Sequence, residues 1–449
     1  MTKIRFLQGL REIGGTFAVI ETERARCMFD FGFANSNRMD DCVERRPGKE
    51  AADCVRLGVL PAQDGIYGEQ AAETLGLKPY GKSGKTDFLL LSHMHIDHCG
   101  GMGMLAPDIP VYMSEDSLTL YRRLSACGES APAEHPNCIG MKPGQKAAVE
   151  DIVIRCVPVD HDVVGACGFL ITTPDGTVAY TGDYRFHGFH PDVTEAFART
   201  AAGCDVLISE GVSVSFSEVD WSALKEQEVR TESTLQDEIA ELTRTEPGLI
   251  IINPYNRNVE RLHHLTETVR QNGRELVLES SAADYLCAFF PQDHPSVYGE
   301  TMPPAAEAER LAGFGCAVVS GAQIAADPEH YVLQLDYVHS AELFDYRGKI
   351  SRYIHMDGTP LGEYMPSYAK LKLLLESQGI PYDYRAVSGH SDPWHLRYMV
   401  ETVHPKTLVP LHSFSPERLA EAYSGNSLLP EPGRVYTLSD GELKEAEEQ

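Results

Sequence analysis

Four side chains of the kind that bind metal ions follow directly after an apolar run in this chain. The run ends at Leu91, and the ligand-type residues then come within six positions, as His93, His95, Asp97 and His98. Neutral imidazole suits zinc, and a strand end holds its ligands rigidly. The motif therefore predicts a metal site at the end of a buried strand.

Three further apolar runs end in a residue of the same chemistry. They are Val157-Pro-Val-Asp-His161, Val178-Ala-Tyr-Thr-Gly-Asp183 and Leu408-Val-Pro-Leu-His412. A single His or Asp at a strand end is more often a cap or a turn residue. Beside the first motif, however, these residues are candidates for the same metal site.

The length of the chain and a change in its secondary-structure pattern indicate two domains. A chain of 449 residues is too long for one ordinary core. Short β-rich runs dominate up to Val178, whereas helices and strands alternate after Glu210, which is typical of a parallel α/β module. We expect residues 1–212 to form the first part of one domain, residues 213–380 to be inserted into it, and residues 381–449 to complete it.

Charge and composition limit the classes of function. The formal net charge of −27 disfavours a broad, sequence-independent grip on nucleic acid, although bound cations can dominate the local field. The apolar runs are strand-sized, so no membrane span is expected. The first residues do not resemble an export signal, and the 11 cysteines show no CxxC pairs, which favours reduced thiols and a cytoplasmic protein.

Taken together, these residues resemble the metallo-β-lactamase superfamily, and within it the β-CASP branch and ribonuclease J. The resemblance extends from Phe6 to about Tyr436 and rests first on the HxHxDH, Gly-Asp and terminal His motifs. Leu207-Ile-Ser-Glu210 and Val387-Ser-Gly-His-Ser391 resemble the first and second β-CASP motifs. Only 37 residues follow His412, which leaves no room for the usual C-terminal domain of ribonuclease J.

The resemblance implies an α/β fold, namely an αββα sandwich with an inserted parallel α/β domain. It also implies two divalent metal ions. His93, His95 and His161 would bind one ion, Asp97, His98 and His412 would bind the other, and Asp183 would bridge them, with Asp97 and Asp183 also taking part in catalysis. Zn²⁺ is the default for ligands rich in histidine, and Mn²⁺ or Fe²⁺ also suits mixed histidine and carboxylate sites.

Further residues receive roles from the same resemblance or from their position. Asp30 is expected to brace the metal-binding loop, and Glu210 is the acidic residue before the insertion. His390, with Ser388 and Gly389, is expected to contact a phosphate or to protonate a leaving group. Asn256, Asn258 and Arg261 open a helix and are candidates for an anion seat, although Asn is also a common N-cap without other function.

Two functions remain open from the sequence. The first is a nuclease that hydrolyses phosphodiester bonds in single-stranded RNA, with 5′-to-3′ exonuclease and endonuclease cleavage both open. The second is a hydrolase of a small ester, thioester, lactone or phosphodiester, which the acidic net charge favours. A homodimer is expected from the resemblance alone.

Overall fold

The chain folds as two compact units in the computed structural model, which describes residues 1–34, 43–129, 133–301 and 305–446. Unit 1 consists of Met1–Phe186, His190–Glu228 and Gly389–Gln449. Unit 2 consists of His187–Phe189 and Val229–Ser388. The second unit is therefore inserted into the chain of the first.

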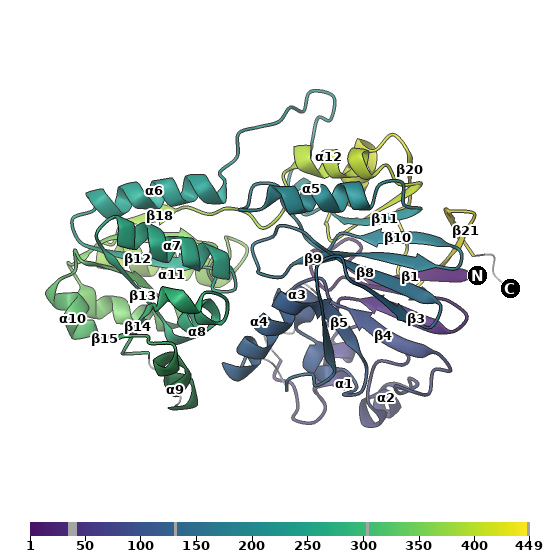
Figure 1. Cartoon of the computed structure of the whole chain (residues 1–449), viewed down its shortest axis with the longest axis horizontal. Helices are drawn as coiled ribbons and strands as arrows, with labels where there is room; N and C mark the ends of the chain where they lie inside the picture. Colours follow the sequence, from purple (N-terminus) through teal and green to yellow (C-terminus); the bar gives the residue numbers. More distant parts are fainter. Residues whose placement is uncertain (35–42, 130–132, 302–304, 447–449) are drawn as a thin grey trace. The chain divides into compact units, whose positions relative to one another are not determined.

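Two mixed sheets form unit 1 (Figure 1). The first has the spatial order β22 (Glu442–Glu445), β21 (Val435–Ser439), β1 (Thr2–Gln8), β2 (Phe17–Glu21), β3 (Ala25–Phe29), β4 (Thr86–Leu90), β5 (Val111–Ser114) and β6 (Cys138–Met141). The second has the order β20 (Asn426–Ser427), β19 (Thr407–Leu411), β11 (Val206–Glu210), β10 (Gly176–Tyr180), β9 (Cys167–Thr173), β8 (Ile152–Pro158) and β7 (Lys146–Val149).

The core of unit 1 lies between these sheets. One cluster of buried side chains joins Phe6 and Phe88 of the first sheet to Ile154 and Ile208 of the second. Helices cover the outer faces, as α4 packs on β5 and β6, α5 on β8 and α13 on β19. This arrangement confirms the predicted αββα sandwich.

The helices of unit 1 are short, and several carry the expected end signals. They are α1 (Glu50–Arg56), α2 (Glu69–Leu75), α3 (Ile96–Cys99), α4 (Glu115–Ala126), α5 (Pro191–Thr200), α12 (Pro393–Val403) and α13 (Pro416–Ala422), with the 3₁₀ turns η2 (Met102–Met104) and η3 (Ser213–Ser215). For example, α12 begins with Pro393 behind Asp392, whose side chain accepts hydrogen bonds from two backbone N–H groups.

Unit 2 is a parallel α/β domain, as predicted. Its sheet has the order β15 (Val318–Val319), β14 (Ser296–Tyr298), β13 (Glu275–Leu278), β16 (Tyr331–Gln334), β12 (Leu249–Pro254), β17 (Ile350–Met356) and β18 (Tyr382–Tyr384), and neighbouring strands in this order are parallel. The strand β12 is buried along its whole length, which explains its continuous apolar run.

Helices surround this sheet. They are α6 (Glu232–Thr245), α7 (Val259–Gln271), α8 (Ser280–Phe289), α9 (Ala305–Gly313), α10 (Gly321–Ala326) and α11 (Pro366–Gln378), with the 3₁₀ segments η4 (Pro291–Asp293) and η5 (Tyr337–Tyr346). Among the described residues, no helix combines the length and the apolar character needed to cross a bilayer.

The borders of the insertion lie later in the chain than the predicted 213 and 380. Ser215 of η3 pairs with Ser413, and the Trp221 carbonyl accepts a hydrogen bond from Arg397, so this segment packs with unit 1. At the other border, β18 continues the parallel sheet of unit 2 beside β17. Border positions depend on these contacts, which composition does not reveal.

Candidate metal centre

The strand order of unit 1 brings the predicted ligands to one edge. Strands β10, β11 and β19 are parallel neighbours, so the residues that follow them, Asp183 and His412 among them, emerge together. Strand β8 runs in the same direction two places away and leads to His161. The loop after β4 in the first sheet supplies the HxHxDH motif. All seven predicted ligands therefore lie in unit 1.

Three groups of ligand-type atoms lie around Asp183, and two of them, the two ligand groups, hold the seven predicted ligands. His93, His95, His161 and Asp183 make one, and Asp97, His98 and His412 make the other. Asp183, His390 and His412 make the third, and the ligand atoms of each group lie within 4.8 Å of one another. Asp183 Oδ2 lies 3.2 Å from His98 Nε2, 3.4 Å from His412 Nε2 and 3.7 Å from His93 Nε2. One carboxylate thus faces both ligand groups.

The donor atoms fit the size of a divalent metal ion. In a tetrahedral site with bonds of about 2.0–2.1 Å, neighbouring donors lie about 3.3 Å apart, close to the separations around Asp183. His93 Nε2, His98 Nε2, His412 Nε2 and Asp183 Oδ2 are buried, yet they make no hydrogen bond with another described residue. Buried polar atoms normally have partners, so this set of donors fits a divalent cation.

Protonation favours the same interpretation for three of the histidines and for Asp183. At His98, burial is outweighed by the carboxylates of Asp183, Asp97 and Asp30, which raise its pKa. Burial lowers the pKa of His161 to about 3 and holds those of His93 and His412 below the ordinary value. Burial opposes the charge on Asp183, but His412 and His98 outweigh it and lower the pKa of this carboxyl. Neutral imidazole and ionised carboxylate are the forms that bind metal ions.

Asp30 contacts the loop that carries the HxHxDH motif. Its Oδ1 accepts a hydrogen bond from the Ser92 backbone N–H at 2.8 Å, and its Oδ2 lies 2.8 Å from His98 Nδ1. Tyr180 donates to the same carboxylate. A carboxylate behind a ligating histidine fixes the orientation of its ring, and this leaves His98 Nε2 directed toward Asp183.

Sequence reasoning missed Asp162, which supports His95 in a similar way. Asp162 Oδ1 lies 3.2 Å from His95 Nε2, while His95 Nδ1 lies 3.2 Å from His161 Nε2. His95 therefore turns Nδ1 toward the ligand group and Nε2 toward Asp162. The only signal in the sequence is its position directly after His161, which does not reveal the contact.

Replacing Asp162 with Ala is expected to weaken binding of the metal ion at the His93 group by roughly 10- to 100-fold, because His95 loses its supporting carboxylate. Asp162→Asn keeps an acceptor and should lose less. Titration with a chelator-buffered Zn²⁺ series measures both affinities. Equal affinity in Asp162→Ala and the parent protein would contradict this role.

His390 lies beside the metal-ligand groups and against Glu210. Its Nδ1 is 3.4 Å from Glu210 Oε1 and 3.9 Å from Asp183 Oδ2. Burial lowers the pKa of His390, but the carboxylates of Glu210, Asp183 and Asp162 outweigh this and raise it to about 9. In the absence of cations, the imidazole is therefore protonated at neutral pH.

Gly389 has a packing reason for being glycine. A Cβ atom at this position would lie 2.5 Å from Asp162 Oδ1 and 2.8 Å from His161 Cε1. Its carbonyl oxygen contacts His161 Nδ1, so this backbone also orients a ligand. Ser388 belongs to unit 2, where its carbonyl lies 2.9 Å from His187 Nε2.

The residues of unit 2 that were predicted to bind an anion have other hydrogen-bond partners. Arg261 is fully buried, and its guanidinium donates to Glu232 and to the carbonyls of Met356 and Val387. The Asn258 side chain caps α7. Asn256 donates to Asp336 at 2.9 Å. Arg261 therefore has a structural role in this unit, and we place no anion on it.

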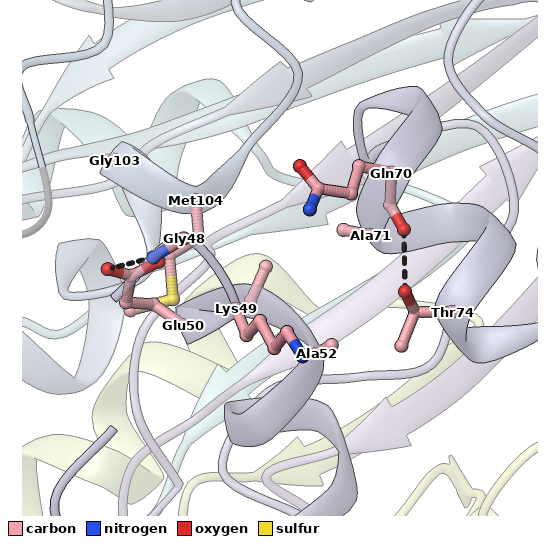
Figure 2. Close-up of a pocket in the computed structure, with 10 residues that line it drawn as sticks. Gly48, Lys49, Glu50, Ala52, Gln70, Ala71, Thr74, Gly103 and Met104 are labelled. Atoms are coloured by element: carbon pink, nitrogen blue, oxygen red, sulfur yellow. Dashed lines mark hydrogen bonds between the residues drawn. The ribbon is translucent and has the colours of Figure 1, made fainter. Parts of the chain in front are cut away.

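A separate recess of about 160 Å³ lies between α1 and α2 (Figure 2). Its polar groups bond locally, since Gly48 N–H donates to Glu50 and the Thr74 hydroxyl donates to the Gln70 carbonyl. The residues that line it include none of the seven ligands. It has no convergent chemistry of its own.

Comparison with known proteins agrees with the site. The Beta-lactamase superfamily domain matches residues 65–240. Ribonuclease J from Pyrococcus abyssi is 24% identical over 295 residues, which cover 62% of this chain and 58% of that protein. Ribonuclease J from Helicobacter pylori is 21% identical over 436 residues, covering 91% and 55%. The chain thus spans about half the length of these curated relatives.

A solved structure matches nearly the whole chain. The crystal structure of a protein of unknown function from Enterococcus faecalis V583 superimposes with a TM-score of 0.81 at 29% identity, covering 97% of this chain and 99% of that one. The two-unit architecture is therefore shared by that solved chain. With its HxHxDH loop and strand-end ligands, the chain carries a match to the Beta-lactamase superfamily domain and is similar to ribonuclease J.

Proposed function

We propose that this protein is a two-metal hydrolase that cleaves phosphodiester bonds in RNA, as a 5′-to-3′ exonuclease. The observation that carries the proposal is the pair of ligand groups facing the single buried carboxylate of Asp183. When bound, two divalent cations would lower the pKa of a shared water and polarise the phosphorus. The similarity to ribonuclease J supports RNA as the substrate.

The residues of this chain would perform the remaining steps. Asp97 is 29% exposed in its side chain and orients the attacking water from the edge of its ligand group. The side chain of His390 is 22% exposed, and its Nδ1 lies 3.9 Å from Asp183 Oδ2. As an imidazolium, it would donate its proton to the oxygen that leaves the phosphorus.

The direct test uses single-stranded RNA carrying a 5′ monophosphate and a label at the 3′ end. Protein loaded with Zn²⁺ or Mn²⁺ should release mononucleotides while the labelled strand shortens. A 5′ hydroxyl strand and a DNA strand of the same sequence test the preference for the end and for the sugar. Intact RNA under every metal condition would refute the nuclease proposal.

A second function has its own support. The net charge of −27, with 39 basic against 66 acidic residues, favours a small substrate over a long polyanion. A panel of chromogenic esters, thioesters, lactones and phosphodiesters separates the two proposals. Turnover of one of these compounds with RNA left intact would establish the alternative.

Replacing His390 with Gln is expected to lower kcat by about 10²- to 10⁴-fold with little change in metal content, because the general acid is lost and His390 is not one of the seven predicted ligands. The dependence of the rate on pH shows which protonation state of His390 is active. Since the protonated imidazole is the active form, the rate should fall as pH rises through the pKa of His390. Bound cations offset the negative charge of the neighbouring carboxylates, and it is this charge that raises the pKa of His390. The fall in rate should therefore occur below pH 9. A His390→Gln variant whose rate still falls over the same pH range would contradict the role of His390 as the general acid.

The homodimer remains a prediction. Analytical ultracentrifugation of the full chain with and without metal ions would decide it, because dimer and monomer differ twofold in mass.

A further inference from the structure

A second cluster of metal-binding side chains lies in unit 2, on the helix α7. His263, His264 and Glu267 place one ligand atom each within 4.8 Å of one another. Glu267 Oε2 is 3.7 Å from His263 Nε2 and 3.8 Å from His264 Nδ1. Residues three and four positions apart share one side of a helix, so Glu267 meets both histidines.

The ring of His263 is held from behind by Asp293 of η4. Asp293 Oδ2 lies 2.7 Å from His263 Nδ1, and the Asp293 side chain is only 5% exposed. Arg270 donates to the Asp293 carbonyl at 2.9 Å, which fixes the turn. A buried carboxylate behind one ring nitrogen is the usual support of a ligating histidine. His263 Nε2 is thus left facing Glu267.

Aromatic contacts restrain both imidazoles further. The His263 ring stacks on Phe290, with centroids 4.0 Å apart and planes 6° apart. The His264 ring lies against Phe189, with centroids 4.3 Å apart. Restrained rings lose little rotamer freedom when they bind an ion. The cluster therefore has the preorganisation that scattered surface histidines lack.

The cluster is also accessible to an ion. The side chains of His263, His264 and Glu267 are 15%, 34% and 45% exposed, so an ion can enter from solvent.

We propose that His263, His264 and Glu267 bind one divalent cation of the Zn²⁺ class, separate from the candidate centre in unit 1. Donor separations of 3.7 and 3.8 Å need to contract by only a few tenths of an ångström to reach the tetrahedral value of about 3.3 Å. Water completes the coordination. Two imidazoles exclude Mg²⁺ and Ca²⁺ as the preferred ions.

The bound ion would link three segments of unit 2. Asp293 and Phe290 join α7 to η4, and Phe189 joins it to the short segment His187–Phe189. The role is therefore structural, and it does not depend on the proposed hydrolase activity.

The test counts ions in the full chain by equilibrium dialysis against buffered free Zn²⁺ and elemental analysis. His264→Ala should bind one ion fewer per chain than the parent protein. His330→Ala is the matched control, because His330 Nε2 lies 3.5 Å from Glu275 Oε2 in an ordinary surface pair. The control should lose none. An unchanged count in His264→Ala would overturn the proposal.

Two further variants distinguish a preorganised metal site from misfolding and from nonspecific binding at the surface. Glu267→Gln removes a ligand at an exposed position and should also lose one ion, even if His264→Ala disturbs folding. Asp293→Asn should keep the saturating count and weaken the affinity by about 10- to 100-fold. If Asp293→Asn binds with parental affinity, the ion is held only adventitiously by surface histidines, and the proposed site does not exist.

Discussion

Asp183→Asn protein is expected to lose roughly 10³-fold or more of its hydrolytic rate, whatever substrate proves to be the natural one. Asp183 Oδ2 faces both ligand groups, at 3.2 Å from His98 Nε2 and 3.7 Å from His93 Nε2. An amide has no charge to offset two cations, and both the activation of water and the stabilisation of transition-state charge would suffer. The rate is measured on RNA and on the small-ester panel.

Metal content separates this effect from unfolding. Asp183→Asn should bind fewer ions in unit 1 while retaining the circular dichroism spectrum of the parent protein. Asp108→Asn is a suitable control, because Asp108 is an exposed carboxylate outside both ligand groups. Full activity in Asp183→Asn would exclude a shared carboxylate from the mechanism.

Arg261→Leu is expected to lower the free energy of unfolding of unit 2 by about 3–5 kcal/mol, because it leaves a buried carboxylate without its partner. Arg261 and Glu232 are both fully buried, with Nη2 to Oε1 at 2.8 Å and Nε to Oε2 at 3.0 Å. The carbonyls of Met356 and Val387 lose their donor as well.

Urea unfolding followed by two probes assigns the effect to the correct unit. Both tryptophans, Trp221 and Trp394, belong to unit 1, so their fluorescence reports that unit, whereas far-ultraviolet circular dichroism reports both. The dichroism transition should shift to lower urea more than the fluorescence transition does. Equal shifts would mean that the two units unfold together.

Two matched variants sharpen the interpretation of Arg261→Leu. Arg244→Ala removes a guanidinium from an exposed pair with Glu241 and should change stability by no more than about 0.5 kcal/mol. Glu232→Leu combined with Arg261→Leu removes the isolated charge and should recover part of the loss. No recovery would indicate that the backbone carbonyls, and not Glu232, cause the instability.

The insertion and the candidate ligands were predictable from local patterns, whereas the αββα sandwich was expected from the resemblance to a known family. An apolar run that ends in His93, His161, Asp183 or His412 indicates both a buried strand and the chemistry at its end. The alternation of helices and strands after Glu210 likewise indicated a parallel sheet. Such signals are contained within a few consecutive residues, so they can be recognised without knowing how distant segments pack.

Contacts between distant residues were not predictable in this way. Asp162 supports His95 from 67 positions away in the chain, and Arg261 reaches Val387 from 126 positions away. Arg261 appeared suited to bind an anion because its neighbours open a helix, but burial against Glu232 gives it a structural partner. A side chain's role depends on the groups that folding places around it.

The amino-acid sequence by itself determined which residues end the strands and which chemistry they carry, because strand periodicity and residue type are local properties. The tertiary structure alone decided which nitrogen of each histidine faces its neighbours, where the insertion begins and ends, and that His263, His264 and Glu267 meet in front of Asp293. These outcomes depend on strand order, burial and ring orientation, which arise only when separate segments pack together.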